Sequence, residues 1–419
     1  MDSNLKKFCK IIFNKYIDIK YKSLTITVGL LCFISIHSIG KEKFSAKAIA
    51  NFASPNLLST HTLGLFSARV SPNFQLEASK RIRFQCDVGT GNVWAPHVQT
   101  FKPKSAEDRA LVAETFWHQR DNPSLRALAH DSSSFHADAI IKTFIPSLVL
   151  PINAKSEIKF SLRTFLVTEG NFPFATIISD GFIEAFHSNI KGGEDPFARK
   201  VYGFNKANIS FTDQNGKSIQ LKRNDFVFAG CATDYFYYLK PTLPLLGQVY
   251  TNIGVHLGIN TTKTNPSIDI GISQMIIKEL LLGQHSFLLV GMGTQLLRKN
   301  LVNYTQGLTL TSNPYLFSFS VEPKLVKETK KGKKFAIAWN FHYQSPYNRR
   351  RAFDQSIFVG ERHTSHWHLG TTHLYQALET HTFVLSFFKK NNLSFYFQQD
   401  FKVNNNADLQ TGVSYQFAL

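Results

Sequence analysis

The chain has 419 residues and a formal net charge of +18, with 43% hydrophobic and only 18% charged residues. Soluble domains usually carry about 25% charged residues, so the charge content is low. An aromatic content of 13% excludes a disordered chain, and four cysteines in so long a chain exclude a disulfide-stapled scaffold.

Residues 1–40 have the pattern of an export signal. Six lysines and two aspartates lie in residues 1–23, and an apolar stretch follows from Leu24 to Ile39 and ends at small residues. That stretch of about 16 residues is shorter than the roughly 20 that a membrane-spanning helix needs. We therefore expect a cleaved signal peptide, with an uncleaved N-terminal anchor as the alternative.

Residues 41–78 alternate only weakly between apolar and polar side chains. They are predicted to form an N-terminal periplasmic segment, a plug or an extra pair of strands.

Period two dominates from residue 79 to the end, which predicts β-strands. In residues 251–259, for example, Thr, Ile, Val, Leu and Ile alternate with Asn, Gly, His and Gly. A soluble sandwich also alternates, but its second face meets bulk water and is rich in charged residues. Here the second face is small, weakly polar and mostly uncharged, as an enclosed, hydrated lumen requires. Strands that cross a bilayer must close into a barrel, because lipid offers the backbone no hydrogen-bond partner.

The pattern predicts an all-β fold, an antiparallel transmembrane β-barrel over residues 79–419 with about twelve strands (range 10–14) and long extracellular loops. The expected strands are 79–90, 138–149, 157–168, 225–238, 249–260, 267–277, 285–297, 313–325, 333–345, 371–388, 392–403 and 408–419. The long connections 91–137, 169–224 and 346–370 are expected to be extracellular. The second should contain a small hairpin around Asn215-Gly216.

The final strand carries the pattern polar, any, Gly, any two, aromatic, any, aromatic at Gln410, Gly412, Tyr415 and Phe417. It resembles the terminal recognition strand of outer-membrane barrels, which implies the barrel-assembly machinery as a partner. An ordinary amphipathic last strand is the alternative. Outer-membrane lipid and lipopolysaccharide are the other expected partners, and export makes nucleic acid an unsuitable one.

Residues 180–187 read Asp-Gly-Phe-Ile-Glu-Ala-Phe-His. This loop resembles the D-G-F-I-E-x-F-H motif of an uncharacterised bacterial outer-membrane β-barrel family, a domain of unknown function. The resemblance implies a barrel and supplies no activity. Asp180, Glu184 and His187 would share one face of a short helix. With Gly181 and Phe182 they form a candidate solute- or cation-binding loop, or else a structural loop held in the lumen by its aromatic residues.

Four basic residues on the presumed inner face, Arg81, Arg83, Lys159 and Arg163, lie on strands that flank the same neighbour. Such a cluster would favour anions in a pore. Alternatively, each base pairs with a lumen acid such as Asp87 or Asp269 and only fills the barrel. His363, His366, His368, His373 and His381 form a histidine-rich run. No Cys and few carboxylates lie nearby, so we expect loop and lumen histidines rather than a metal site, and no cofactor motif is present.

No nucleophile or nucleotide-binding motif occurs. The sequence therefore predicts a non-enzymatic outer-membrane barrel of a Gram-negative bacterium, either a narrow passive channel or a structural or surface protein. Two alternatives remain: a barrel enzyme acting on lipid or peptide, whose residues come from separate strands, and a secreted β-rich binding protein.

Overall fold

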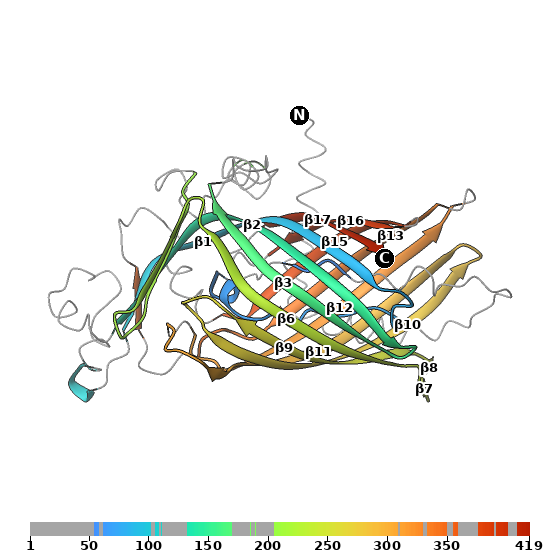
Figure 1. The fold of residues 1–419 in the computed structure, drawn as a ribbon, viewed down its shortest axis with the longest axis horizontal. Helices are drawn as coiled ribbons and strands as arrows, with labels where there is room; N and C mark the ends of the chain where they lie inside the picture. Colours follow the sequence, from blue (N-terminus) through green and yellow to red (C-terminus); the bar gives the residue numbers. More distant parts are fainter. Residues whose placement is uncertain are drawn as a thin grey trace.

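The structure is a computed structural model, and it describes residues 54–57, 62–101, 105–108, 110, 132–169, 185, 189, 205–308, 311–329, 333–349, 355–358, 376–388, 391–400 and 409–419. Within these residues, twelve antiparallel strands close into a barrel (Figure 1). They are β1 (Arg83–Phe101), β2 (Ser132–Asn153), β3 (Ser156–Thr168), β6 (Phe226–Leu239), β9 (Tyr250–Asn260), β10 (Ser267–Gly283), β11 (Ser286–Asn303), β12 (Tyr315–Glu328), β13 (Lys334–Gln344), β15 (Leu378–Phe388), β16 (Asn392–Gln399) and β17 (Leu409–Ala418).

The barrel closes because β1 pairs with the last strand and with the second. Arg83 lies opposite Ala418 of β17 on one side and opposite Val149 of β2 on the other. Both ends of the barrel sequence therefore lie at the same rim, the periplasmic one in an outer-membrane barrel, and the long connections lie at the opposite, extracellular rim.

Each of the twelve predicted strands corresponds to one barrel strand, so the predicted fold class is confirmed. The prediction was wrong for residues 91–101 and 132–137, which were assigned to a loop and instead continue β1 and β2 beyond the barrel. There β2 pairs with β4 (Asn208–Thr212), and β4 with β5 (Ser218–Lys222). The extensions persist because these added strands supply the backbone partners that a lone pair lacks.

The β4–β5 hairpin forms where the sequence predicted it. Asp213 accepts hydrogen bonds from the backbone N–H groups of Asn215 (2.8 Å) and Lys217 (3.0 Å). Gly216 adopts a φ of 73°, a left-handed conformation that glycine reaches without a steric penalty. Two shorter pairs complete the described strands: β7 (Thr242–Leu243) with β8 (Gly247–Gln248), and β14 (Gln355–Phe358) with the outer end of β1.

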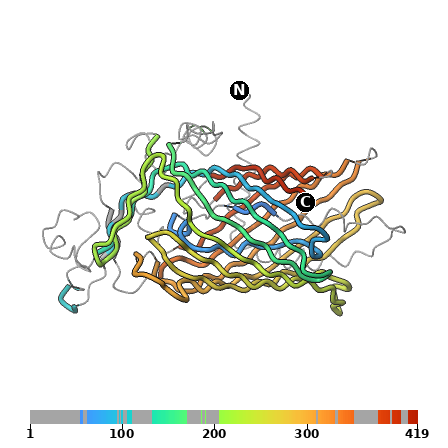
Figure 2. The backbone as a smooth tube through the Cα atoms, in the orientation of Figure 1, coloured from blue at the N-terminus to red at the C-terminus, as the bar shows by residue number. Residues whose placement is uncertain are grey.

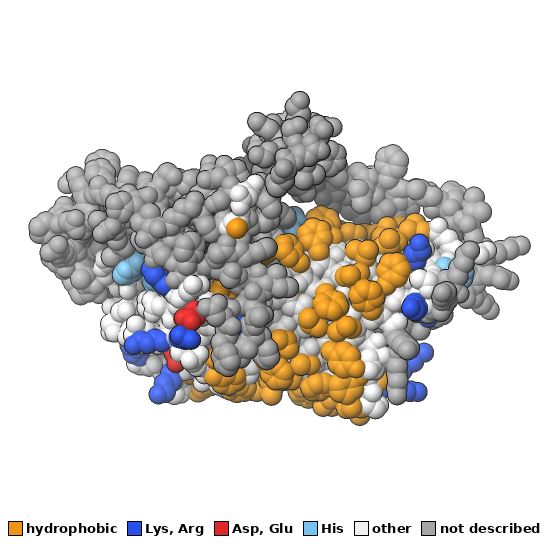
Figure 3. All heavy atoms as spheres, turned by 90° about the horizontal axis from the view of Figure 1, so that it is seen from above, with side chains coloured by type: hydrophobic (Ala, Val, Ile, Leu, Met, Phe, Trp, Pro, Cys, Tyr) orange, Lys and Arg blue, Asp and Glu red, His pale blue; other side chains and the backbone are white. Residues whose placement is uncertain are grey.

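The predicted alternation of faces is present in three dimensions. In β9, Ile253, Val255 and Leu257 are 41–46% exposed on the outer surface. Asn252 and His256, which point inward, are 0% and 4% exposed. Figure 3 shows the hydrophobic side chains as a band across the wall, with Lys and Arg gathered at its two ends. An apolar band of this kind suits hydrocarbon, so the barrel is a transmembrane one, and a secreted β-rich protein would not present it to water.

Candidate functional site: the occupied lumen

The lumen contains part of the chain's own N-terminal region. Residues 54–57 and 62–79, here called the inner segment, lie inside the barrel, and they include the short 3-10 helix η3 (Thr62–Phe66). In Figure 2 the blue trace of this region passes between the near and the far strands. Most of its described side chains are buried. The segment that the sequence left open as periplasmic, plug or strand pair therefore occupies the lumen at these residues.

Near the periplasmic rim, Glu157 of β3 holds the end of the inner segment. Its carboxylate accepts hydrogen bonds from the backbone N–H of Ser79 (2.7 Å) and from the Tyr238 hydroxyl (2.7 Å). Arg83 lies 3.7 Å from the same carboxylate and donates to the Gln75 side chain at 2.7 Å. A buried carboxylate is stable only when its oxygens are paired in this way.

Nearer the extracellular rim, Asp269 of β10 binds the inner segment in the same way. Its carboxylate accepts from the backbone N–H of Ala68 (2.9 Å) and from the Asn260 amide (2.7 Å). Arg163 of β3 donates to the carbonyl oxygen of Ser67 and, at 2.6 Å, to the Asn260 side-chain oxygen. The inner segment is thus fixed to the wall by charge-assisted hydrogen bonds at two heights, which are stronger than neutral ones.

Glycines in the wall leave room for the inner segment. Side chains at Gly258 of β9, Gly271 of β10 and Gly291 of β11 would collide with Ala68, Val70 and Phe74, respectively. The three glycines lie on successive strands, and each omits a β-carbon where an inner side chain touches the wall. The groove accommodates the inner segment by shape as well as by hydrogen bonds.

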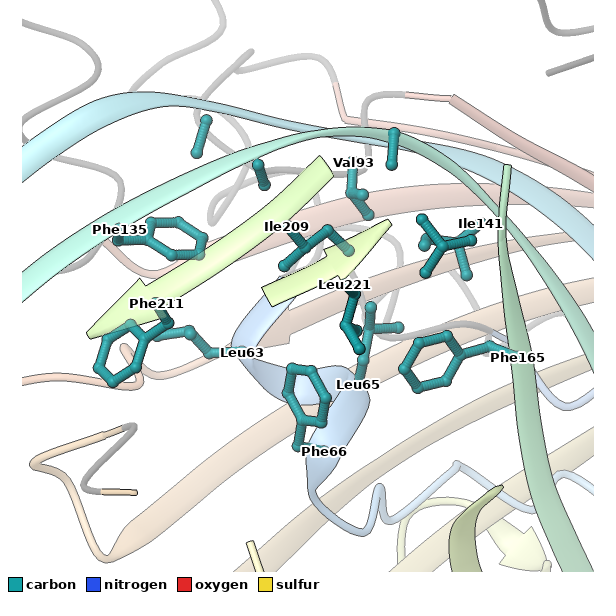
Figure 4. Close-up of a cluster of buried hydrophobic side chains, with 14 of the residues drawn as sticks. Leu63, Leu65, Phe66, Val93, Phe135, Ile141, Phe165, Ile209, Phe211 and Leu221 are labelled. Atoms are coloured by element: carbon teal, nitrogen blue, oxygen red, sulfur yellow. The ribbon is translucent and has the colours of Figure 1, made fainter. Parts of the chain in front are cut away.

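A hydrophobic cluster covers the extracellular end of the lumen (Figure 4). Leu63, Leu65 and Phe66 of η3 lie among apolar side chains of β1 to β6, and the Phe66 and Phe165 rings meet edge-on at 5.9 Å. The other buried members are Val93, Ala95, Phe135, Ala137, Ala139, Ile141, Val167, Ile209, Phe211, Leu221 and Ala229. This cluster anchors η3 beneath the β4–β5 hairpin.

The four predicted basic residues do not all share one site. Arg83 and Lys159 lie in one row, on either side of Val149. Lys159 donates to the Asn56 side-chain oxygen at 2.7 Å, and Arg163 lies further out beside Asn260. Arg81 is exposed. The three inward-facing bases thus bind the inner segment or its supports, which fits the alternative that they fill the barrel.

A row of polar residues on three adjacent strands was not predicted. His256 of β9 lies 2.7 Å from the Asp234 carboxylate of β6 through Nδ1 and 2.8 Å from the Ser273 hydroxyl of β10 through Nε2. This is the hydrogen-bond order of a serine hydrolase triad. The three residues are 22 and 17 positions apart, so only the strand register brings them together. His256 and Ser273 are both 4% exposed.

The loop motif Asp180, Gly181, Phe182, Glu184 and His187 lies outside the described residues, and its resemblance to the outer-membrane family stays a prediction.

Among the described residues, no group of three or more His, Cys, Asp and Glu side chains is placed to hold a metal ion. His381, the described member of the histidine-rich run, stacks on Trp339 at 5.7 Å and accepts from its indole N–H.

The residues of the predicted terminal signal lie in β17, where the barrel closes. Gln410 is buried and Tyr415 is exposed on the outer face. Phe417 packs against Phe84 of β1 with ring centroids 5.4 Å apart. A side chain at Gly412 would collide with the Tyr396 ring.

In the part of the chain that is described, no helix has the length and hydropathy needed to cross a membrane.

No protein-family model and no curated protein sequence matches the chain. Three solved structures illustrate its structural matches. An outer-membrane channel from Pseudomonas putida has a TM-score of 0.37 and 9% identity, covering 84% of this chain and 100% of the other. The β domain of the Bordetella autotransporter BrkA has a TM-score of 0.34 and 5% identity, covering 81% of this chain and 100% of the other. An anion-selective porin from Comamonas acidovorans has a TM-score of 0.23 and 9% identity, covering 80% of this chain and 100% of the other. At such low similarity nothing about function follows from these matches, and the barrel assignment rests on this chain's own strand pairing and apolar band.

Proposed function

We propose that this protein is an outer-membrane barrel that works as a narrow channel for small polar solutes and that is closed while the inner segment occupies its lumen. The occupied lumen is the observation that carries the proposal. A cavity of only about 20 Å³ lies between the inner segment, at Ser54, Arg69 and Ser71, and the wall residues Glu322 and His342. That volume holds about one water molecule.

The inner surface supports a polar solute. The buried polar residues are mainly Asn, Gln, Ser and Thr. Several of the buried charged residues, among them Glu157, Lys159 and Asp269, bind the inner segment. A barrel with a purely structural role could be filled by the side chains of its own wall, without a separate segment inside it. Apart from its continuation into β1, the inner segment is held to the wall by hydrogen bonds and close packing against glycines, so it can move without breaking the barrel wall.

Disulfide locking with planar-bilayer recording tests this proposal. Val70→Cys with Gly271→Cys, in a background with Cys86→Ser and Cys231→Ser, joins the inner segment to β10. Cγ2 of Val70 lies 2.7 Å from the position of a β-carbon at residue 271, the close approach that a disulfide requires. We expect small, infrequent openings in the wild type, none in the oxidised variant, and recovery after reduction.

Two results would contradict the closed-channel proposal. A steady conductance that oxidation leaves unchanged would mean that solutes pass without movement of the inner segment. Silence in the wild type and in the reduced variant alike would favour a structural or surface role.

We further propose that the chain is exported through residues 1–40 and resides in the outer membrane of a Gram-negative bacterium. The apolar band and the basic, apolar N-terminal pattern support this location. Fractionation after an alkaline wash tests it: the protein should stay with the outer membrane and start near residue 41, and release into the soluble fraction would contradict it.

A hydrolase is the second candidate, because of the Asp234–His256–Ser273 row. In a hydrolase, His256 would take the proton of Ser273 and Asp234 would orient the ring. The low exposure of Ser273 weighs against attack on a substrate, since a nucleophile needs room for the reacting carbonyl. We therefore place the hydrolase below the closed channel.

A further inference from the structure

A second cavity, of about 600 Å³, lies at the extracellular rim beside the β4–β5 hairpin. Its walls come from four stretches, residues 217–221, 226–228, 262–264 and 306–308, together with Phe66 of η3. This volume lies within the roughly 300–1,000 Å³ typical of small-molecule sites.

The cavity lies at the outer end of β6, where its ladder with β9 stops. The ladder between β6 and β9 ends at Gly230 opposite Asn260, although β6 begins at Phe226. Gly230 has a φ of 139°, and a β-carbon there would collide with the Ile259 carbonyl oxygen. The register of β6 against β3 also shifts at this point, as at a β-bulge, which bends a strand locally.

Residues from both faces of this strand line the cavity. Phe226 and Phe228 are 66% and 41% exposed on the outer surface. Val227, between them, packs inward against the hydrophobic cluster around η3. The cavity therefore borders both the lipid-facing side chains of β6 and Phe66, at the outer end of the lumen.

The charges of the cavity wall have one sign. Lys217 and Lys263 are the charged residues among those that line it; Lys217 is half-buried and Lys263 is exposed. The Lys217 ammonium donates to the backbone and side-chain oxygens of Gln306 at 3.1 and 3.3 Å, which holds it at the rim. Two ammonium groups above an aromatic, lipid-facing surface match an anionic headgroup joined to an apolar chain.

We propose that this cavity is a lateral binding site for a lipid of the outer leaflet whose phosphate-bearing headgroup carries a net negative charge. Its acyl chain lies along Phe226 and Phe228, and its phosphate lies between Lys217 and Lys263. The site goes beyond the proposed channel, because lipid binding does not depend on whether the barrel conducts.

Tryptophan quenching by brominated lipids tests the proposal on the full-length protein in nanodiscs. Phe226→Trp is made in a background where Trp94, Trp117, Trp339 and Trp367 are replaced by Phe. Dibrominated phosphatidylglycerol and dibrominated phosphatidylcholine are compared as quenchers at low salt. We expect the anionic lipid to be preferred by roughly fivefold or more, because each lysine near a membrane surface attracts anionic lipid by about that factor.

Two matched controls separate the site from general surface charge. Lys217→Gln with Lys263→Gln should remove the preference. Lys206→Gln with Lys222→Gln removes the same charge from the same hairpin region outside the cavity lining and should leave it unchanged. A reporter at Ile272→Trp, in the middle of the apolar band, should be quenched equally by both lipids.

The unboiled-gel mobility of each variant confirms that the barrel has folded. Equal quenching of the Phe226→Trp reporter by the two lipids would overturn the proposal. So would a preference that survives loss of Lys217 and Lys263, or an equal preference at residue 272.

Discussion

Val70 of the inner segment fills the space that a side chain at Gly271 of β10 would need: a β-carbon there would lie 2.7 Å from Cγ2 of Val70 and 3.0 Å from the Leu296 carbonyl oxygen. The wall and the inner segment are therefore complementary in shape. The contact shows that the lumen is built around this segment, since a glycine in a strand otherwise only weakens it.

Gly271→Ala should loosen the inner segment. The added methyl group overpacks the contact with Val70, at a cost of roughly 1–3 kcal/mol. We expect more frequent openings in planar-bilayer recordings, with unchanged unboiled-gel mobility. Gly283→Ala on the same strand is the matched control, because no atom lies within 4 Å of a β-carbon there. Equal behaviour of the two variants would show that the glycine contact does not hold the segment.

Arg163 and Asp269 should prove energetically coupled. Asn260 bridges them, accepting from Arg163 at 2.6 Å and donating to Asp269 at 2.7 Å. Arg163→Met or Asp269→Asn alone leaves one member of a buried charge network unpaired, at a cost of about 3–5 kcal/mol. The double variant should lose less than the sum. A double-mutant cycle on urea unfolding in lipid vesicles measures this, and strict additivity would contradict the network.

Ser273 should not behave as a nucleophile. A fluorophosphonate probe should leave the protein unlabelled in detergent, because Ser273 is 4% exposed and packed against the inner side of β9. Ser273→Ala should instead lower stability by roughly 1–3 kcal/mol, since it removes the partner of His256 Nε2. Mass spectrometry that finds the probe on Ser273 in the wild type, and on no residue of Ser273→Ala, would move the hydrolase to first place.

Gly412→Ala should prevent closure of the barrel. A side chain at this position of β17 would collide with the Tyr396 ring of β16 and with the Val88 carbonyl oxygen of β1. Because β17 joins β1 to β16, we expect most of the refolded variant to migrate as unfolded on unboiled gels. Gly283→Ala is again the control. A normally folded Gly412→Ala barrel would mean that glycine is not required at the closing strand.

Phe417→Ala tests the terminal strand as an assembly signal. Its ring packs on Phe84, so some stability will be lost in any setting. If the strand is also recognised by the assembly machinery, the folded fraction should fall further in cells than after refolding into vesicles. Equal losses in the two settings would leave Phe417 with a packing role alone.

The barrel could be predicted from the amino-acid sequence alone. Alternation along residues such as 251–259 assigns each side chain to lipid or lumen from its own strand alone, because a strand has period two whatever its neighbours are. The same local signal located all twelve strands and the hairpin at Asn215-Gly216. It failed beyond the membrane at residues 91–101, where β1 persists only because β2 and β14 pair with it.

The contents of the lumen could not be predicted from the sequence, because they depend on contacts between distant residues. The contact of Ala68 with Asp269 joins residues 201 positions apart, and Asp234, His256 and Ser273 meet through the registers of two ladders. Neither leaves a periodic pattern in the chain. The lateral cavity likewise depends on where the β6–β9 ladder stops, a property of two strands together. Local periodicity determines which face of the strand a side chain lies on, whereas strand register and the path of the chain determine which residues it contacts.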